Sequence, residues 1–112
     1  MFNLFSRFTG PDPNGIEHEE FAEAVKAGKC TVVDVREAHE FASAHIPKSL
    51  NMPLSTFDPA KIPAGKPVVL ICHSGMRSRS AIAKAQQHGL QDVKHYPHGI
   101  AGWYSRRGDL TR

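Results

Sequence analysis

The chain is 112 residues long, 40% apolar and 22% charged, with a formal net charge of +3 at pH 7, which fits one soluble domain with a single core. No stretch approaches the roughly 20 apolar residues of a transmembrane helix, and two cysteines are too few for a disulfide scaffold, so we expect a reduced, cytoplasmic protein. The basic residues lack an aromatic-interleaved stripe, so we expect small anions as partners, and neither nucleic acid nor a membrane.

Residues 1–15 are predicted to form an N-terminal extension ahead of a single domain over residues 16–112. The extension lacks the sustained apolar core of a signal peptide. Its three Phe and one Leu could contact a membrane or a partner, but an arm that loosely covers the domain is the favoured interpretation. A helix predicted over 17–27 follows, with Phe21, Ala24 and Val25 on one face and Gly28 at its end.

The stretch CTVVDV, residues 30–35, is β-branched and apolar up to Asp34, as expected for a strand that is buried on both faces. A short helix, a brief strand and a proline-rich loop with room for one helical turn are predicted next, at residues 37–45, 49–52 and 53–66. Another buried strand, a helix, a short strand and a final helical segment complete the chain, at residues 67–72, 78–88, 93–96 and 100–107.

This alternation of strands and helices predicts an α/β fold with a parallel sheet that is covered on both faces. The helix over 78–88 should turn Ala81, Ile82 and Ala85 inward and end at Gly89. Ligands of such sheets bind at the carboxyl ends of the strands. The residues that reach these ends are Arg36, Cys72 and His98.

Cys72 ends a buried strand and is followed almost at once by a helix, so its sulfur is predicted to lie at a helix N-terminus. Unpaired N–H groups and the helix dipole stabilise an anion there, and nearby cations strengthen the effect. Gly75 can adopt a backbone conformation closed to other residues. The further groups that favour an anion are Ser74, Arg77, Ser78 and Arg79. The pattern indicates a nucleophilic cysteine in an anion-binding loop.

Cys30 has none of these neighbours and is interpreted as a small apolar residue in a strand, with a resolving thiol as the alternative. The seven histidines are scattered along the chain, and only His95 and His98 are close in sequence. No carboxylate or cysteine stands at metal-site spacing from them, so we expect no metal and interpret the histidines as surface or structural residues.

Four sequence blocks together resemble the rhodanese family of single-domain sulfurtransferases, over about residues 16–108. The blocks are Asp34-Val35-Arg36-Glu37, His45-Ile46-Pro47-Lys48-Ser49-Leu50-Asn51, Cys72-His73-Ser74-Gly75-Met76-Arg77-Ser78 and Gly99-Ile100-Ala101-Gly102-Trp103. Their order and spacing make the resemblance specific, although one block alone would be weak.

The resemblance implies a three-layer α/β/α fold with a five-stranded parallel sheet. It also implies a ping-pong reaction in which Cys72 takes the outer sulfur of thiosulfate or a related donor and holds it as a persulfide. Cyanide, a thiol or a protein then accepts that sulfur, and no cofactor is needed. The N–H groups of residues 73–78 would cradle the persulfide, Asp34 would brace the loop, and Arg36 would lie near the pocket. A monomer or weak homodimer is expected.

Two positions depart from the pattern of many relatives. His98-Gly99 stands where a Gly-Gly pair is common, so His98 either lines the pocket rim or extends the last strand. His73 directly follows Cys72 and either orients a donor or faces solvent, and solvent is the favoured interpretation.

The cysteine loop is also compatible in outline with two other functions. Phosphatase or arsenate reductase chemistry occurs in rhodanese-like relatives with five residues between the cysteine and the arginine, but only four separate Cys72 from Arg77. The shorter loop favours a single sulfur atom over a tetrahedral oxyanion. A non-enzymatic binding module is the second alternative, and the intact cysteine loop argues against it.

Overall fold

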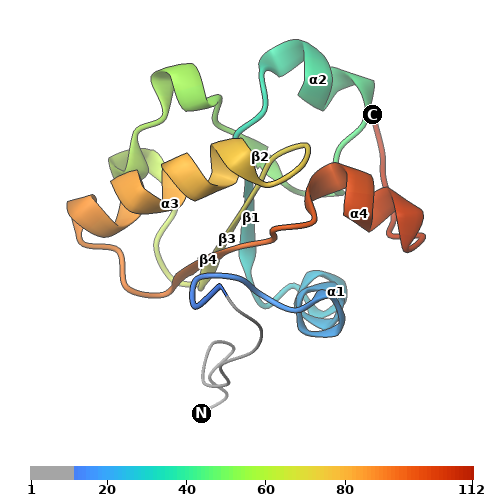
Figure 1. Ribbon diagram of the computed structural model, residues 1–112, viewed down its shortest axis with the longest axis horizontal. Helices are drawn as coiled ribbons and strands as arrows, with labels where there is room; N and C mark the ends of the chain where they lie inside the picture. Colours follow the sequence, from blue (N-terminus) through green and yellow to red (C-terminus); the bar gives the residue numbers. More distant parts are fainter. Residues whose placement is uncertain (1–11) are drawn as a thin grey trace.

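Four short strands form a fully parallel sheet in the order β2-β1-β3-β4 in the computed structural model, which describes residues 12–112 (Figure 1). The register places Asp34, the last residue of β1, between Asn51 of β2 and Ile71 of β3. The carboxyl ends of the central strands therefore meet at one edge. The strands are β1 (Thr31–Asp34), β2 (Leu50–Asn51), β3 (Val68–Ile71) and β4 (Val93–His95).

Helices cover both faces of this sheet, as the sequence predicts (Figure 1). One apolar cluster joins the sheet to α1 and α4, and a second joins it to α3 and the two 3₁₀ turns. The molecule is therefore a three-layer α/β/α domain. The helical elements are α1 (His18–Ala27), α2 (Ala38–Ser43), η1 (Leu54–Thr56), η2 (Pro59–Lys61), α3 (Met76–His88) and α4 (Gly99–Ser105).

All four side chains of β3 are buried, because layers of helix lie on both sides of it. Successive side chains of a strand point to opposite faces. Val69 and Ile71 accordingly belong to the cluster on the α1 side, whereas Val68 and Leu70 belong to the cluster on the α3 side. β3 thus directs its carboxyl end, and Cys72 after it, to the middle of the sheet edge.

The expectation of five strands is wrong, since the sheet of residues 12–112 has four. Beside β4, Gly15 forms a single parallel bridge with His95, and the Ile16 N–H donates to the His95 carbonyl at 3.0 Å. The chain just before this bridge folds into a turn, closed by Gly15 N–H on the Asp12 carbonyl and by Asn14 N–H on the Asp12 side chain. Within residues 12–112, pairing beside β4 is therefore limited to this single bridge.

Residues 12–15 of the predicted extension therefore lie against β4, while residues 1–11 fall outside the described part of the chain. Several predicted boundaries also move by one or two residues. α3 begins at Met76 and not at residue 78, because Gly75 takes a left-handed φ of 105° and becomes the N-cap. α2 stops at Ser43 because Ala44 is extended.

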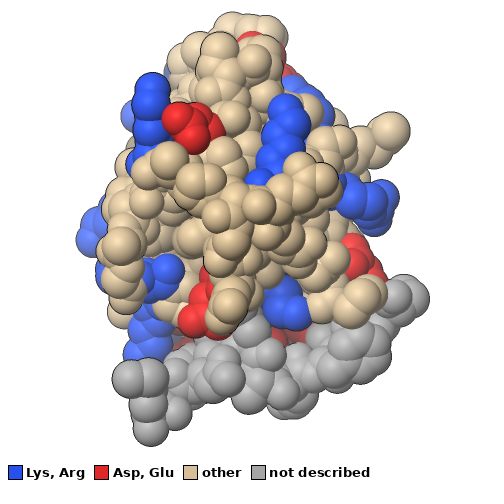
Figure 2. Space-filling model, turned by 90° about the vertical axis from the view of Figure 1, so that its left-hand side faces the viewer, with Lys and Arg blue, Asp and Glu red and all other residues tan. Residues whose placement is uncertain are grey.

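None of the helices in residues 12–112 is both long and apolar enough to cross a membrane. On the face drawn in Figure 2, the Lys and Arg side chains stand apart, with uncharged and acidic residues between them. This distribution is consistent with the sequence-based preference for small partners, which stays a prediction.

Candidate active site

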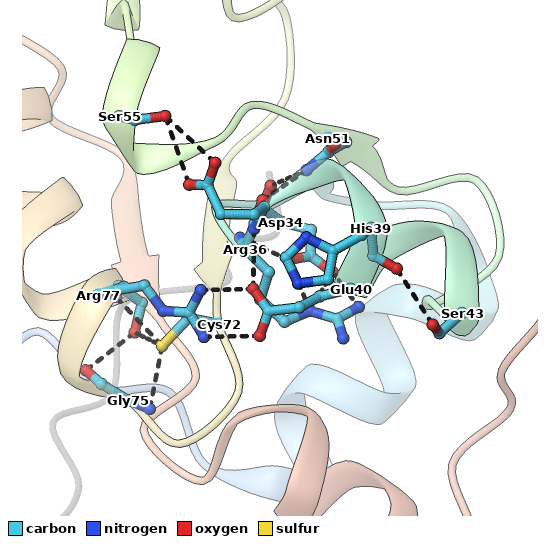
Figure 3. A network of polar contacts seen from close by, with 12 residues as sticks. Asp34, Arg36, His39, Glu40, Ser43, Asn51, Ser55, Cys72, Gly75 and Arg77 are labelled. Atoms are coloured by element: carbon cyan, nitrogen blue, oxygen red, sulfur yellow. Dashed lines mark hydrogen bonds and ion pairs between the residues drawn. The ribbon is translucent and has the colours of Figure 1, made fainter.

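Cys72 follows β3 at the carboxyl edge of the sheet and is only 1% exposed. Its Sγ accepts hydrogen bonds from the Gly75 N–H at 3.1 Å and the Ser78 N–H at 3.3 Å, as Figure 3 shows for Gly75. Both donors belong to the N-terminal end of the 13-residue helix α3. The positive end of that helix and its free N–H groups stabilise a negative charge on the sulfur.

Two glycines allow the loop after Cys72 to approach the segment before α4. A Cβ on Gly75 would lie 2.4 Å from the Pro97 carbonyl oxygen, and a Cβ on Gly99 would lie 2.1 Å from the His73 carbonyl oxygen. The Ile100 N–H donates to the Cys72 carbonyl at 2.8 Å. The start of α4 therefore fixes the backbone of the cysteine loop from outside the loop itself.

Arg77 extends from the first turn of α3 toward α2 and not freely into solvent. Its guanidinium donates to both carboxylate oxygens of Glu40, at 2.6 and 3.0 Å, and Figure 3 shows this pair beside the sulfur of Cys72. The hydrogen bond from Arg77 lowers the pKa of Glu40 to about 2, and the same bond raises the pKa of Arg77. The cation predicted to meet an incoming anion is thus already paired with a carboxylate.

Glu40 was not among the predicted site residues. A signal for its placement exists in the sequence, because Glu37 and Glu40 stand three residues apart at the start of a helix. In the structure the two form a capping box, with the Glu37 N–H donating to Glu40 Oε1 at 2.9 Å. The cap orients Glu40, and the direction toward Arg77 follows from the packing of α2.

Asp34 and Arg36 form a buried pair at the end of β1. The fully buried Asp34 carboxylate accepts from the Arg36 N–H, Nε and Nη2, with a closest distance of 2.8 Å. Arg36 Nη2 also donates to the Ala44 carbonyl, and Asn51 Nδ2 donates to the carbonyls of Asp34 and Arg36. These contacts direct the Asp34 side chain to Arg36, whereas the resemblance implied that it braces the cysteine loop.

The remaining predicted loop residues, His73, Ser74 and Met76, are exposed. The exposure of His73 agrees with its favoured solvent-facing interpretation, and its role toward a donor stays a prediction. His98 is also exposed and precedes α4 as its N-cap, with its ring against Tyr96. β4 ends three residues before it, so the interpretation of His98 as an extension of the strand is wrong.

Behind the sulfur lies a buried polar chain that the sequence did not reveal. Ser78 Oγ is 3.7 Å from Cys72 Sγ and 2.8 Å from His95 Nδ1, and His95 Nε2 is 2.8 Å from Asp12 Oδ2. Ser78 and His95 are both fully buried. Asp12 and His95 are 83 residues apart, and no local pattern connects positions so distant.

Cys30 lies away from this site. It precedes β1, at the opposite edge of the sheet from Cys72, and belongs to the cluster on the other face. Burial raises the pKa of its thiol to about 11, against a smaller opposite effect of Lys66. Its distance from Cys72 in the fold and its raised pKa both argue against a role as a resolving thiol. Within residues 12–112, no three His, Cys, Asp or Glu side chains gather as metal ligands would.

Comparison with known proteins agrees with this geometry. The family described as the rhodanese-like domain matches residues 17–106 of the chain. The chain belongs to the rhodanese-like family of sulfurtransferases. This match spans α1 through α4, including Cys72 and the loop after it.

Relatives of this rhodanese-like domain include the thiosulfate sulfurtransferase GlpE of Pseudomonas savastanoi, 36% identical over 82% of the chain and 89% of the relative. The thiosulfate:glutathione sulfurtransferase of Saccharomyces cerevisiae is 33% identical over 70% of the chain and 67% of its own length. A crystal structure of a rhodanese-related protein from Thermoplasma volcanium superposes with a TM-score of 0.79 at 28% identity, covering 88% of this chain and 97% of that one. An uncharacterised Synechocystis relative is longer, and the matched region spans 41% of it.

Proposed function

We propose that this domain transfers a sulfane sulfur from thiosulfate or a related anionic donor to a thiophilic acceptor through a persulfide on Cys72. The observation that carries the proposal is the position of Cys72 Sγ, which accepts two N–H groups at the start of α3. A sulfur in that position is stabilised as an anion, and the thiolate is the nucleophilic form of cysteine. The names of two relatives, which specify thiosulfate, support the choice of donor.

The reaction has two displacement steps. The Cys72 thiolate attacks the outer sulfur of thiosulfate, the sulfur–sulfur bond of the donor breaks, and sulfite leaves with the electron pair. The acceptor, which is cyanide, a low-molecular-weight thiol or a protein thiol, then attacks the outer sulfur of the persulfide. The Cys72–sulfur bond breaks and the thiolate is regenerated. The Gly75 and Ser78 N–H groups stabilise the leaving thiolate in this second step.

The geometry around Arg77 favours this chemistry over phosphoryl transfer. A phosphate-binding loop needs its arginine to clasp the oxyanion. Here both Nη atoms of Arg77 are bound by Glu40, and the loop before it is one residue shorter than in the phosphatase relatives. Arg77 is therefore proposed to act through its charge on the incoming donor and on the nearby sulfur.

The test compares thiosulfate with an aryl phosphate as substrate, and cyanide with glutathione as acceptor. The wild-type chain should form thiocyanate from thiosulfate and cyanide and leave the aryl phosphate intact. Cys72→Ser should reduce the rate to that of the uncatalysed reaction, since no other group supplies the nucleophile. Intact mass after thiosulfate treatment should increase by one sulfur, located on the peptide that contains Cys72.

Cys30→Ser is the matched control and should keep the wild-type rate, because Cys30 lies at the other edge of the sheet. Sulfur recovered on Cys30, or full turnover by Cys72→Ser, would refute the proposal. Hydrolysis of the aryl phosphate in preference to sulfur transfer would establish the rival function instead.

A further inference from the structure

The fully buried His95 has a defined partner on each ring nitrogen. Nε2 lies 2.8 Å from a carboxylate oxygen of Asp12, and Nδ1 lies 2.8 Å from the hydroxyl of Ser78. A carboxylate only accepts hydrogen bonds, so Nε2 must carry a proton. In the neutral imidazole Nδ1 is then the acceptor, and it receives the proton of the Ser78 hydroxyl.

Ser78 has alternative partners for its single hydroxyl proton. Besides His95, the Gly75 carbonyl oxygen can accept this proton at 3.1 Å, while Ser78 Oγ itself accepts from Cys72 Sγ at 3.7 Å. If His95 gains a proton on Nδ1, that nitrogen becomes the donor and the hydroxyl turns to the Gly75 carbonyl. Each buried group therefore keeps a partner in both protonation states, which a purely structural contact would not require.

We propose that Ser78, His95 and Asp12 form a proton relay that accepts the thiol proton of Cys72. The S–H bond of Cys72 breaks as its proton moves to Ser78 Oγ, and the hydroxyl proton of Ser78 moves to His95 Nδ1. The products are a thiolate, held by the Gly75 and Ser78 N–H groups, and an imidazolium, held by Asp12. No electrons are exchanged. Because His95 acts through Ser78, it is a positioning residue and not a catalytic one.

The charges around the relay are consistent with this role. Partial burial acts to raise the pKa of Asp12, but the hydrogen bonds from His95 and the Asn14 N–H lower it overall, with a contribution from the charge of Arg79. Asp12 is therefore a carboxylate that can hold an imidazolium. Arg79 Nη2 lies 3.8 Å from Asp12 Oδ2 at the exposed end, and Lys94 on β4 donates to the Pro13 carbonyl. Arg77 acts electrostatically on Cys72 at the other end.

This inference rests on the proposed function, but its test does not need turnover. The rate at which iodoacetamide alkylates Cys72 is measured across pH in the full chain, with the modified peptide identified by mass. His95→Asn can still accept from Ser78 but cannot take up a proton. We expect its alkylation profile to move to higher pH by about one unit, a roughly tenfold lower rate near pH 6.

Three further variants make the test decisive. Ser78→Ala removes the hydroxyl, keeps the backbone contact to Sγ and should give the same shift, and Asp12→Asn should give a smaller one. His18→Asn is the matched control, because His18 also has its Nδ1 2.8 Å from a hydroxyl, that of Tyr96, but is only partly buried and lies outside the relay. Its profile should match the wild type.

Superimposable profiles for wild type and His95→Asn would overturn the relay. If circular dichroism shows that His95→Asn is unfolded, Ser78→Ala and Asp12→Asn decide the question by the same criterion. If the wild type transfers sulfur but His95→Asn leaves the alkylation profile unchanged, the proposed function is supported and the relay is refuted. If His95→Asn shifts the profile but the wild type transfers no sulfur, the relay is supported and the proposed function is refuted.

Discussion

Gly28 and Gly99 have nearly the same backbone conformation in very different surroundings. Their φ angles are 67° and 65°, in the left-handed region that disfavours residues with a Cβ. Among residues 12–112, no atom beyond its chain neighbours stands within 4 Å of a Cβ on Gly28, whereas a Cβ on Gly99 would lie 2.1 Å from the His73 carbonyl oxygen. The pair therefore separates the cost of backbone strain from the cost of displacing the cysteine loop.

We expect Gly28→Ala to lower the free energy of unfolding by about 1 kcal/mol, the strain of one left-handed residue. Gly99→Ala adds overpacking against the His73 backbone and should cost about 2–4 kcal/mol. It should also slow sulfur transfer in the fraction that remains folded, because the loop that holds Cys72 must move. Urea unfolding and thiocyanate formation measure both effects. Equal destabilisation by the two substitutions would contradict the close contact between α4 and the loop.

Residues of the site differ in whether their place could be predicted from the sequence. Cys72 and Gly75 could be placed because their roles depend on a local strand–loop–helix pattern. The long-range partners around the site could not be predicted, because Glu40 and Arg77 are 37 residues apart and Asp12 and His95 are 83 residues apart. Such contacts depend on how helices pack and on where the N-terminal segment crosses β4. Neither leaves a periodic signal in the chain.

At the scale of elements, the Glu40–Arg77 pair connects α2 to the first turn of α3. The ordinary pKa of a glutamate, 4.5, falls to about 2 here, first because of the hydrogen bond from Arg77. Below about pH 4.5 Glu40 therefore becomes protonated in the unfolded chain, whereas in the folded chain it stays ionised down to about pH 2. The stability that this pair contributes is fully present above that pH and is lost as the pH falls through about 2.

Glu40→Gln tests this connection, because glutamine can still accept the capping hydrogen bond from the Glu37 N–H. The wild type should exceed the variant by about 1 kcal/mol at neutral pH, a modest value because the two side chains are 34% and 27% exposed. Urea titrations at several values between about pH 7 and pH 3 should show this difference shrinking with acid. A difference that is constant with pH would show that the charge of Glu40 is not responsible.

Element boundaries differ from prediction for physical reasons that are visible in the structure. Predicted strands are one or two residues too long, because apolar residues such as Cys30 and Val35 stay buried beyond the last ladder contact. The fifth strand, which the resemblance implied, is replaced by a single bridge at Gly15. The pairing stays this short because the chain turns at Asp12 and Asn14. The four sequence blocks that carry the resemblance do not include this turn.

At the scale of the whole molecule, two apolar clusters share one thin sheet. The two central strands, β1 and β3, contribute alternate side chains to both, as β1 does with Val32 on one side and Val33 on the other. Neither cluster can form without the sheet, and the sheet has no stable face without both. The domain should therefore unfold as one cooperative unit in spite of its two separate cores.

Ile82 and the single tryptophan, Trp103, provide a test of that cooperativity from opposite faces. Ile82 is 3% exposed in the cluster under α3, and Trp103 is 3% exposed in the cluster under α1 and α4. Ile82→Ala should cost about 2–5 kcal/mol, the usual effect of a buried large-to-small change. The same loss should appear in Trp103 fluorescence and in far-ultraviolet circular dichroism, because one transition serves both faces.

Lys84→Ala is the matched control for Ile82→Ala, since Lys84 is exposed on the same helix and should change stability by less than about 0.5 kcal/mol. A Trp103 signal that kept its wild-type midpoint while the circular dichroism of Ile82→Ala shifted would show that the faces unfold separately.

Coincident shifts would have a consequence for the active site. Cys72 belongs to the cluster of Ile82, whereas Ile100, which donates to the Cys72 carbonyl, belongs to the cluster of Trp103. Cooperative unfolding would therefore keep the two halves of the cysteine loop's support together until the whole domain unfolds.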